Sequence, residues 1–241
     1  MNKPLLVFQA PVATRSGYGD HSRDILKSIF DLDRYDVKIV PTRWGNTPQD
    51  QIDPQTEFGQ KILSNIVTQL DRQPDIFIQV SVANEFKRVA KYNIGITAGV
   101  ETTVAPKEFL DGGNQMDLII TPSEFTKDVL IKTSYSQVDK NTQQVLGEIR
   151  LQKPVEVLFE GVDTSIFNDV INKDFKLDIK ENFAYLFVGH WLKGNLGHDR
   201  KDVGMLIRCF VESFKDEKDK PALVLKTSSA NFSVKERESF R

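Results

Sequence analysis

Short apolar runs alternate along this chain with longer amphipathic stretches. The apolar runs predict buried strands at Leu5–Gln9, Val37–Val40, Asp75–Val80, Asn93–Ala98, Asp117–Thr121 and Val155–Phe159. Helical spacing of apolar residues predicts helices at Asp20–Phe30, Glu57–Leu70 and Phe125–Ile131. Strands that alternate with helices in this way predict an α/β protein with a Rossmann-like, doubly wound parallel sheet.

The alternation of strands and helices is interrupted once and later resumes. The polar stretch Ser134–Gln144 predicts a surface excursion that includes a short hairpin. After a polar bridge, the pattern returns with a strand, a helix and a strand at Ala184–Val188, Val203–Phe214 and Ala222–Lys226, and a capping box at Ser233–Glu236 predicts one more helix. Two parallel strands cannot enclose a core of their own. We therefore expect a domain over 1–167, a linker over 168–182, and an incomplete second Rossmann-like domain over 183–241.

Composition narrows the class of protein. Lys and Arg number 32 against 34 Asp and Glu, so the net charge of -2 gives no general attraction to nucleic acid. No run approaches the roughly 18 apolar residues of a membrane span, so we expect no transmembrane segment. The first apolar run ends at Gln9-Ala10-Pro11 and fits a strand better than a signal peptide. The expected location is cytoplasmic.

Cysteine and histidine are too scarce for a Cys/His metal site. The chain has one cysteine, Cys209, and three histidines. Cys209 lies in an apolar helical run and is expected to be a small buried side chain. No metal site is expected.

The first candidate for chemistry is a glycine loop directly after the first strand. Gly17, Tyr18 and Gly19 precede a helix, whose first amides can bind an anion. The spacing is not that of a dinucleotide fingerprint, which disfavours an oxidoreductase of the dehydrogenase type. We expect the amides of Gly17–Gly19 to be unpaired, and a side chain at Gly19 to block a phosphate without harming the fold. A plain strand-to-helix turn remains the alternative, although Arg15 and His21 favour a ligand.

A carboxylate and a Pro-Ser-Glu element follow two later strands. Glu101 lies in a small-residue loop, where it could bind sugar hydroxyls, act as a base, or cap a helix. Ser123 or Thr121 is expected to cap the helix that follows.

Basic residues follow the first strand of the second unit. His190 follows that strand in a glycine-containing loop, and Arg200 and Lys201 stand at the start of the next helix. A guanidinium and an ammonium suit a diphosphate, although an exposed surface pair would have the same sequence.

Taken in order, these motifs resemble retaining glycosyltransferases of the family 4 type, which have the two-domain GT-B fold. The stretches that carry the resemblance are SGYGDHSRDIL, IGITAGVETTVAP, DLIITPSEFTKDVL, VEVLFEGVDTSIF and FVGHWLKG with DRKDVGMLIRCF. Glu160 stands where the family often has Asn, and His190 where it usually has Arg. The family's acidic donor motif is absent from this chain.

The resemblance implies a role for several residues. Gly17, Tyr18 and Gly19 would lie near the donor phosphates, and Lys201 would contact the diphosphate, with Arg200 compensating for His190. Glu101 is the one candidate base. The donor would be a nucleotide-diphosphate sugar, with no cofactor and no metal, because Arg and Lys neutralise the leaving group. The acceptor could be a sugar, a lipid or a protein.

One alternative stays open. A truncated or degenerate transferase would bind an acceptor or a partner protein without catalysis, and His190 together with the missing donor motif favours it.

Overall fold

The computed structural model describes residues 3–139, 142–170, 177–191, 197–199 and 201–228. The chain divides into two compact units, Met1–Val162 and Asp163–Arg241. The expected Ser233–Glu236 helix start and Arg200 lie outside the described residues.

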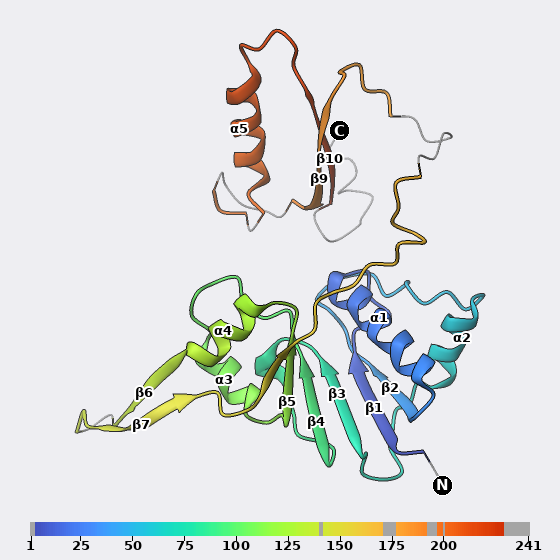
Figure 1. Ribbon diagram of the computed structural model, residues 1–241, viewed down its shortest axis with the longest axis vertical. Helices are drawn as coiled ribbons and strands as arrows, with labels where there is room; N and C mark the ends of the chain where they lie inside the picture. Colours follow the sequence, from blue (N-terminus) through green and yellow to red (C-terminus); the bar gives the residue numbers. More distant parts are fainter. Residues whose placement is uncertain (1–2, 140–141, 171–176, 192–196, 200, 229–241) are drawn as a thin grey trace. The chain divides into compact units, whose positions relative to one another are not determined.

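The first unit is built on a six-stranded sheet in the order β2-β1-β3-β4-β5-β8 (Figure 1). Every neighbouring pair in it is parallel. The strands are β1 (Leu5–Ala10), β2 (Asp36–Pro41), β3 (Ile76–Val80), β4 (Tyr92–Ile96), β5 (Leu118–Thr121) and β8 (Val155–Val157). The prediction of an α/β fold with a parallel sheet flanked by helices is confirmed.

Helices cover both faces of this sheet because its strands are apolar on both sides. Leu6 and Phe8 of β1 pack with α1 (Gly17–Leu32) and α2 (Glu57–Ser64) on one face. Leu5 and Val7 point to the other face, where Phe77 packs against them. On that second side, η1 (Ala83–Glu85), α3 (Lys107–Gly113) and α4 (Glu124–Lys132) build a further cluster around buried residues such as Leu110, Met116, Ile119 and Leu130.

Two helices differ from their predictions. α2 ends at Ser64 rather than at Leu70, because the following residues extend the sheet edge beside β2. There Ile39 N donates to Asn65 O at 2.8 Å, and Val67 N donates to Ile39 O at 3.0 Å. α3 was not predicted, since it is short and carries Gly112 and Gly113.

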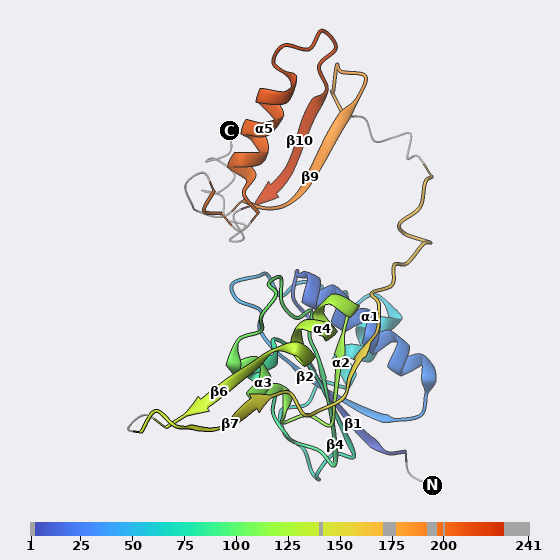
Figure 2. The same ribbon diagram turned by 60° about the vertical axis from the view of Figure 1, so that its left-hand side comes forward.

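An antiparallel hairpin interrupts the order of strands before β8. It consists of β6 (Ser134–Val138) and β7 (Val145–Arg150), and Figures 1 and 2 both show it projecting from the first unit. Tyr135 anchors its base by donating a hydrogen bond to Ala105 O at 2.6 Å. The predicted surface excursion is therefore present as a hairpin.

The second unit contains a β–α–β arrangement among its described residues. β9 (Ala184–His190) and β10 (Ala222–Ser228) are parallel neighbours, and α5 (Val203–Phe214) connects them. Tyr185 packs on Phe210 and Phe214 of the helix, with ring centroids 6.1 and 5.8 Å away.

The buried position predicted for Cys209 is wrong. The residue is exposed, and α5 packs on Tyr185 of β9 through Phe210 and Phe214 instead. None of the helices in the described ranges combines the length and apolar composition that crossing a bilayer requires.

Candidate functional site

The carboxyl edge of the sheet is where an α/β protein of this kind binds ligands. From β1 the chain runs to β2 on one side and later returns to β3 on the other side, so the topological switch point lies between β1 and β3. α1 begins at this edge, directly after β1. The glycine loop predicted from the sequence is therefore at the switch point.

The first turn of α1 is capped by the protein itself. Ser16 is the N-cap residue, and its Oγ accepts a hydrogen bond from Gly19 N at 3.0 Å. The expectation of three unpaired amides is thus wrong for Gly19, because a serine at the N-cap satisfies the third amide of the helix. Among the described residues, no group accepts a hydrogen bond from the amide of Gly17 or of Tyr18.

Gly17 and Gly19 differ in how much space surrounds them. A Cβ on Gly19 would lie 2.3 Å from Thr14 O, a backbone atom that cannot move aside easily. A Cβ on Gly17 would meet nothing within 4 Å. The expectation that a side chain at Gly19 leaves the fold intact is therefore wrong, and Gly17 is the position whose surroundings are open.

The side chain of Tyr18 reaches across the edge to the end of β4. Its hydroxyl accepts a hydrogen bond from Ala98 N at 2.9 Å and lies 3.3 Å from Thr97 Oγ1. Its ring stacks on Trp44, with the centroids 4.0 Å apart. Burial raises the pKa of the Tyr18 hydroxyl above its ordinary value.

Two carboxylates that follow other strands act on Tyr18, and one of them pairs with His21. His21 Nδ1 lies 3.7 Å from Glu160 Oε1, which follows β8. The imidazole is mostly buried, whereas about half of the carboxylate is exposed. The negative charges of Glu160 and Glu85 add to the rise of the Tyr18 pKa that burial begins. Two carboxylates thus act on the pKa of the Tyr18 phenol, and His21 pairs with one of them.

Sequence reasoning found only part of this arrangement. His21 and Glu160 were each singled out, but their pairing depends on where β8 enters the sheet. Trp44 was missed, and its signal is slight: an aromatic residue before a glycine, after the second strand. Arg15, which favoured a ligand, forms a salt bridge with Asp50 at 2.6 Å on the surface.

Glu101 lies in an exposed loop that follows β4 at the same edge. Glu101 is not the N-cap residue of the next helix, α3, because that position is Pro106. At the following strand end, Ser123 caps α4 as expected, its Oγ accepting from Thr126 N at 3.2 Å.

The predicted phosphate ligands of the second unit occupy the end of a strand and the approach to a helix. His190 is the last residue of β9. Lys201 is exposed and precedes the first residue of α5, Val203, by two positions. Both belong to a different unit from Gly17, Tyr18, Gly19 and Glu101. The structure brings the first-unit residues to one edge of a sheet, and His190 and Lys201 belong to the second unit.

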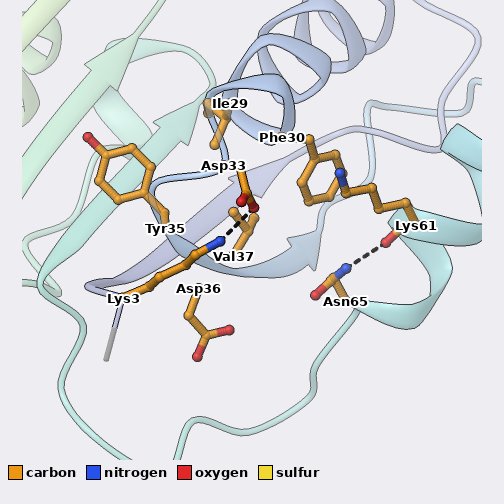
Figure 3. Close-up of a pocket in the computed structure, with 9 residues that line it drawn as sticks. All are labelled: Lys3, Ile29, Phe30, Asp33, Tyr35, Asp36, Val37, Lys61 and Asn65. Carbon is orange, nitrogen blue, oxygen red and sulfur yellow. Dashed lines mark hydrogen bonds and ion pairs between the residues drawn. The ribbon is translucent and has the colours of Figure 1, made fainter. Parts of the chain in front are cut away.

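A pocket of about 380 Å³ opens at the opposite, amino-terminal edge of the sheet (Figure 3). Its charged side chains are engaged within the protein, since Lys3 Nζ binds Asp33 Oδ1 at 2.6 Å and Lys61 Nζ lies over the Phe30 ring. Because it opens where β1 and β2 begin, this pocket is separate from the candidate site.

In the part of the chain that the structure describes, no three His, Cys, Asp or Glu side chains gather closely enough to hold a metal ion. No protein-family model matches the chain, and no curated protein matches it significantly. Its function is therefore argued from its own residues and their geometry.

Proposed function

We propose that this protein is a glycosyltransferase that moves a sugar from a nucleotide-diphosphate sugar to an acceptor hydroxyl, with retention of configuration. The observation that carries the proposal is the first turn of α1, which lies at the switch point of a doubly wound sheet. There the amides of Gly17 and Tyr18 donate to no other described group, and the space beside Gly17 is open. Such a helix start binds phosphate through backbone amides and the helix dipole.

The order of motifs along the chain supports a sugar nucleotide over a dinucleotide. The glycine loop lacks the dinucleotide spacing, and the elements that follow it resemble family 4 glycosyltransferases in sequence order. In the proposed reaction, the bond from the anomeric carbon to the donor phosphate oxygen breaks and a bond to the acceptor oxygen forms. The acceptor proton passes to the departing diphosphate.

Charge neutralisation is assigned to basic residues rather than to a metal. Arg200 and Lys201 would stabilise the leaving diphosphate, and preorganised charge of this kind is commonly the largest contribution to catalysis. Glu101, the base candidate from the sequence, is the alternative to the diphosphate as acceptor of that proton. His21, paired with Glu160, is a second group at the same edge that could contact an acceptor hydroxyl.

The proposal is tested by nucleotide-sugar binding to two glycine variants. We expect the protein to bind UDP-glucose, GDP-mannose or ADP-glucose with a Kd below about 1 mM. Gly17→Val places a side chain in the open space at the helix start and should weaken that binding by about tenfold or more, or about 1.4 kcal/mol. Gly147→Val, at another open position, is the matched control and should bind as the parent does. The measurement is saturation-transfer NMR with titration, followed by an assay for donor hydrolysis.

Two results would contradict the proposal. One is that none of the three nucleotide sugars binds. The other is that Gly17→Val binds as tightly as Gly147→Val. Binding without donor hydrolysis or transfer to any acceptor would favour the non-catalytic module instead.

A further inference from the structure

Tyr18 links three segments that are far apart in the sequence. It belongs to the first turn of α1, its ring stacks on Trp44 in the loop after β2, and its hydroxyl meets the chain just beyond β4. A tyrosine that only contributed a backbone amide to a phosphate site would need none of these side-chain contacts.

The hydroxyl of Tyr18 holds two consecutive residues beyond β4. Ala98 N donates to the hydroxyl at 2.9 Å, and the hydroxyl lies 3.3 Å from Thr97 Oγ1, where either oxygen can supply the hydrogen. Thr97 Oγ1 also accepts from Gly99 N at 3.2 Å. One phenol and one threonine therefore satisfy the amides that start the loop.

The same segment is held from its other side by α4. Gly99 has a φ of +86°, and a Cβ on it would lie 1.9 Å from Thr126 Cγ2. The chain at Ala98 and Gly99 thus passes between α1 and α4 with little freedom. The exposed residues 101–104, which include Glu101, follow directly.

The ring of Tyr18 is itself restrained, so its hydroxyl can fix a position. Its centroid lies 4.0 Å from that of Trp44 with the planes 24° apart, and its hydroxyl is desolvated enough to raise its pKa. A side chain packed in this way has few rotamers available, and its hydrogen bonds then define distances between the elements that it joins.

We propose that Tyr18 is a positioning residue, which sets the loop at 98–104 against the first turn of α1 so that the phosphate-binding amides and the carboxylate of Glu101 form one site. The identity of the ligand rests on the proposed function. The link between α1 and the loop at 98–104 rests on the hydrogen bonds of the Tyr18 hydroxyl. Tyr18 acts here through its side chain, whereas the contact expected with the donor is through its backbone.

The test compares Tyr18→Phe with the parent protein by hydrogen exchange without ligand and by titration with UDP, GDP and ADP. Tyr18→Phe keeps the stacked ring and removes only the hydroxyl. We expect exchange at Ala98 and Gly99 to become about tenfold faster, because Ala98 N loses its acceptor and Thr97 loses a partner. The affinity for the nucleotide that the parent binds should fall about fivefold.

Two controls separate positioning from a general loss of stability. Ile29→Val removes a buried methyl group from the same helix and should leave exchange at Ala98 and nucleotide affinity unchanged. Thr97→Val removes the other hydroxyl of the link and should reproduce the faster exchange at Gly99, which keeps the test decisive if Tyr18→Phe folds poorly.

The outcomes distinguish this inference from the proposed function. Unchanged exchange at Ala98 in Tyr18→Phe would overturn the inference, as would Ile29→Val having the same effect. Unchanged affinity despite faster exchange would also overturn it, since the loop would then not matter for the site. If the parent binds none of the nucleotides while exchange changes as expected, the link is supported and the proposed function is wrong.

Discussion

Single residues at the carboxyl edge of the sheet have roles that differ from those their sequence neighbourhood suggests. Gly17 and Gly19 look equivalent along the chain, but only Gly19 is enclosed by the backbone of Thr14. Tyr18 lies between them, and its side chain serves the loop after β4. Neighbours in a helix point in different directions, so adjacent residues can belong to different contacts.

The pKa of Tyr18 predicts a dependence of stability on alkaline pH. Burial raises this pKa above its ordinary value of 10.0, so the folded protein favours the neutral phenol. The stabilisation from Tyr18 is then fully present below pH 10 and is lost as the pH rises through the higher pKa of the folded state. We expect the difference in unfolding free energy between the parent and Tyr18→Phe to be constant from pH 7 to about pH 9.5 and to shrink above it. Urea unfolding at several pH values measures this, and a difference that stays constant to pH 11 or grows would contradict it.

The spacing of apolar residues was sufficient to predict some helices but not others. α1 and α5 follow their helical patterns, because each has an apolar face long enough to outweigh local preferences. α3 forms without a strong pattern, since Gly112 lets it approach the chain at Ala83 closely. Close backbone contact of this kind stabilises an element that helix propensity disfavours.

Gly112 tests that account of α3. A Cβ there would lie 1.9 Å from Ala83 O, so Gly112→Ala must push α3 away from η1. We expect a loss of about 1–3 kcal/mol in the free energy of unfolding, the usual cost of overpacking. Gly147→Ala, in β7, adds the same methyl group where nothing lies within 4 Å and should be neutral or slightly stabilising. Equal stability of the two variants in thermal and urea unfolding would show that α3 does not depend on this contact.

At the scale of the whole molecule, the two units differ in how well they cover their sheets. In the first unit, helices bury both faces of six strands. In the second, apolar side chains of β9 remain largely exposed among the described residues, with Leu186 at 66% and Val188 at 61%. A sheet whose faces are both covered can fold by itself, and one with an exposed apolar face gains less from burial.

This difference predicts that the first unit folds independently. A fragment of residues 1–162 should unfold cooperatively and keep the circular dichroism of an α/β protein. Limited digestion of the whole chain with chymotrypsin should cut first after the exposed residues Phe159 or Phe167 and leave a stable N-terminal product. Mass spectrometry identifies the product. First cuts within β1–β5, or a fragment without a cooperative transition, would contradict independent folding.

Much of the fold followed from the sequence, whereas the candidate site did so only in part. The strands of the sheet were predicted because buried parallel strands are short and apolar on both faces. α2 was predicted too long because Ile66 and Val67 fit a helical face as well as they fit the sheet edge that they occupy. Ser123 was expected as a cap, since that role is local. Capping by Ser16 is equally local but was missed. The enclosure of Gly19 depends on how the preceding loop folds back at Thr14, and periodicity does not report on that.

The sequence alone determined the class of fold, the sheet strands, and a glycine loop at the start of a helix after the first strand. These are local properties, set by the spacing of apolar residues and by the backbone freedom of glycine. Only the tertiary structure decided the strand order, and with it the switch point between β1 and β3. It also decided that Tyr18 meets Ala98 and that His21 meets Glu160. Those contacts join residues that are distant along the chain, and they arise because parallel strands bring their carboxyl ends to a single edge.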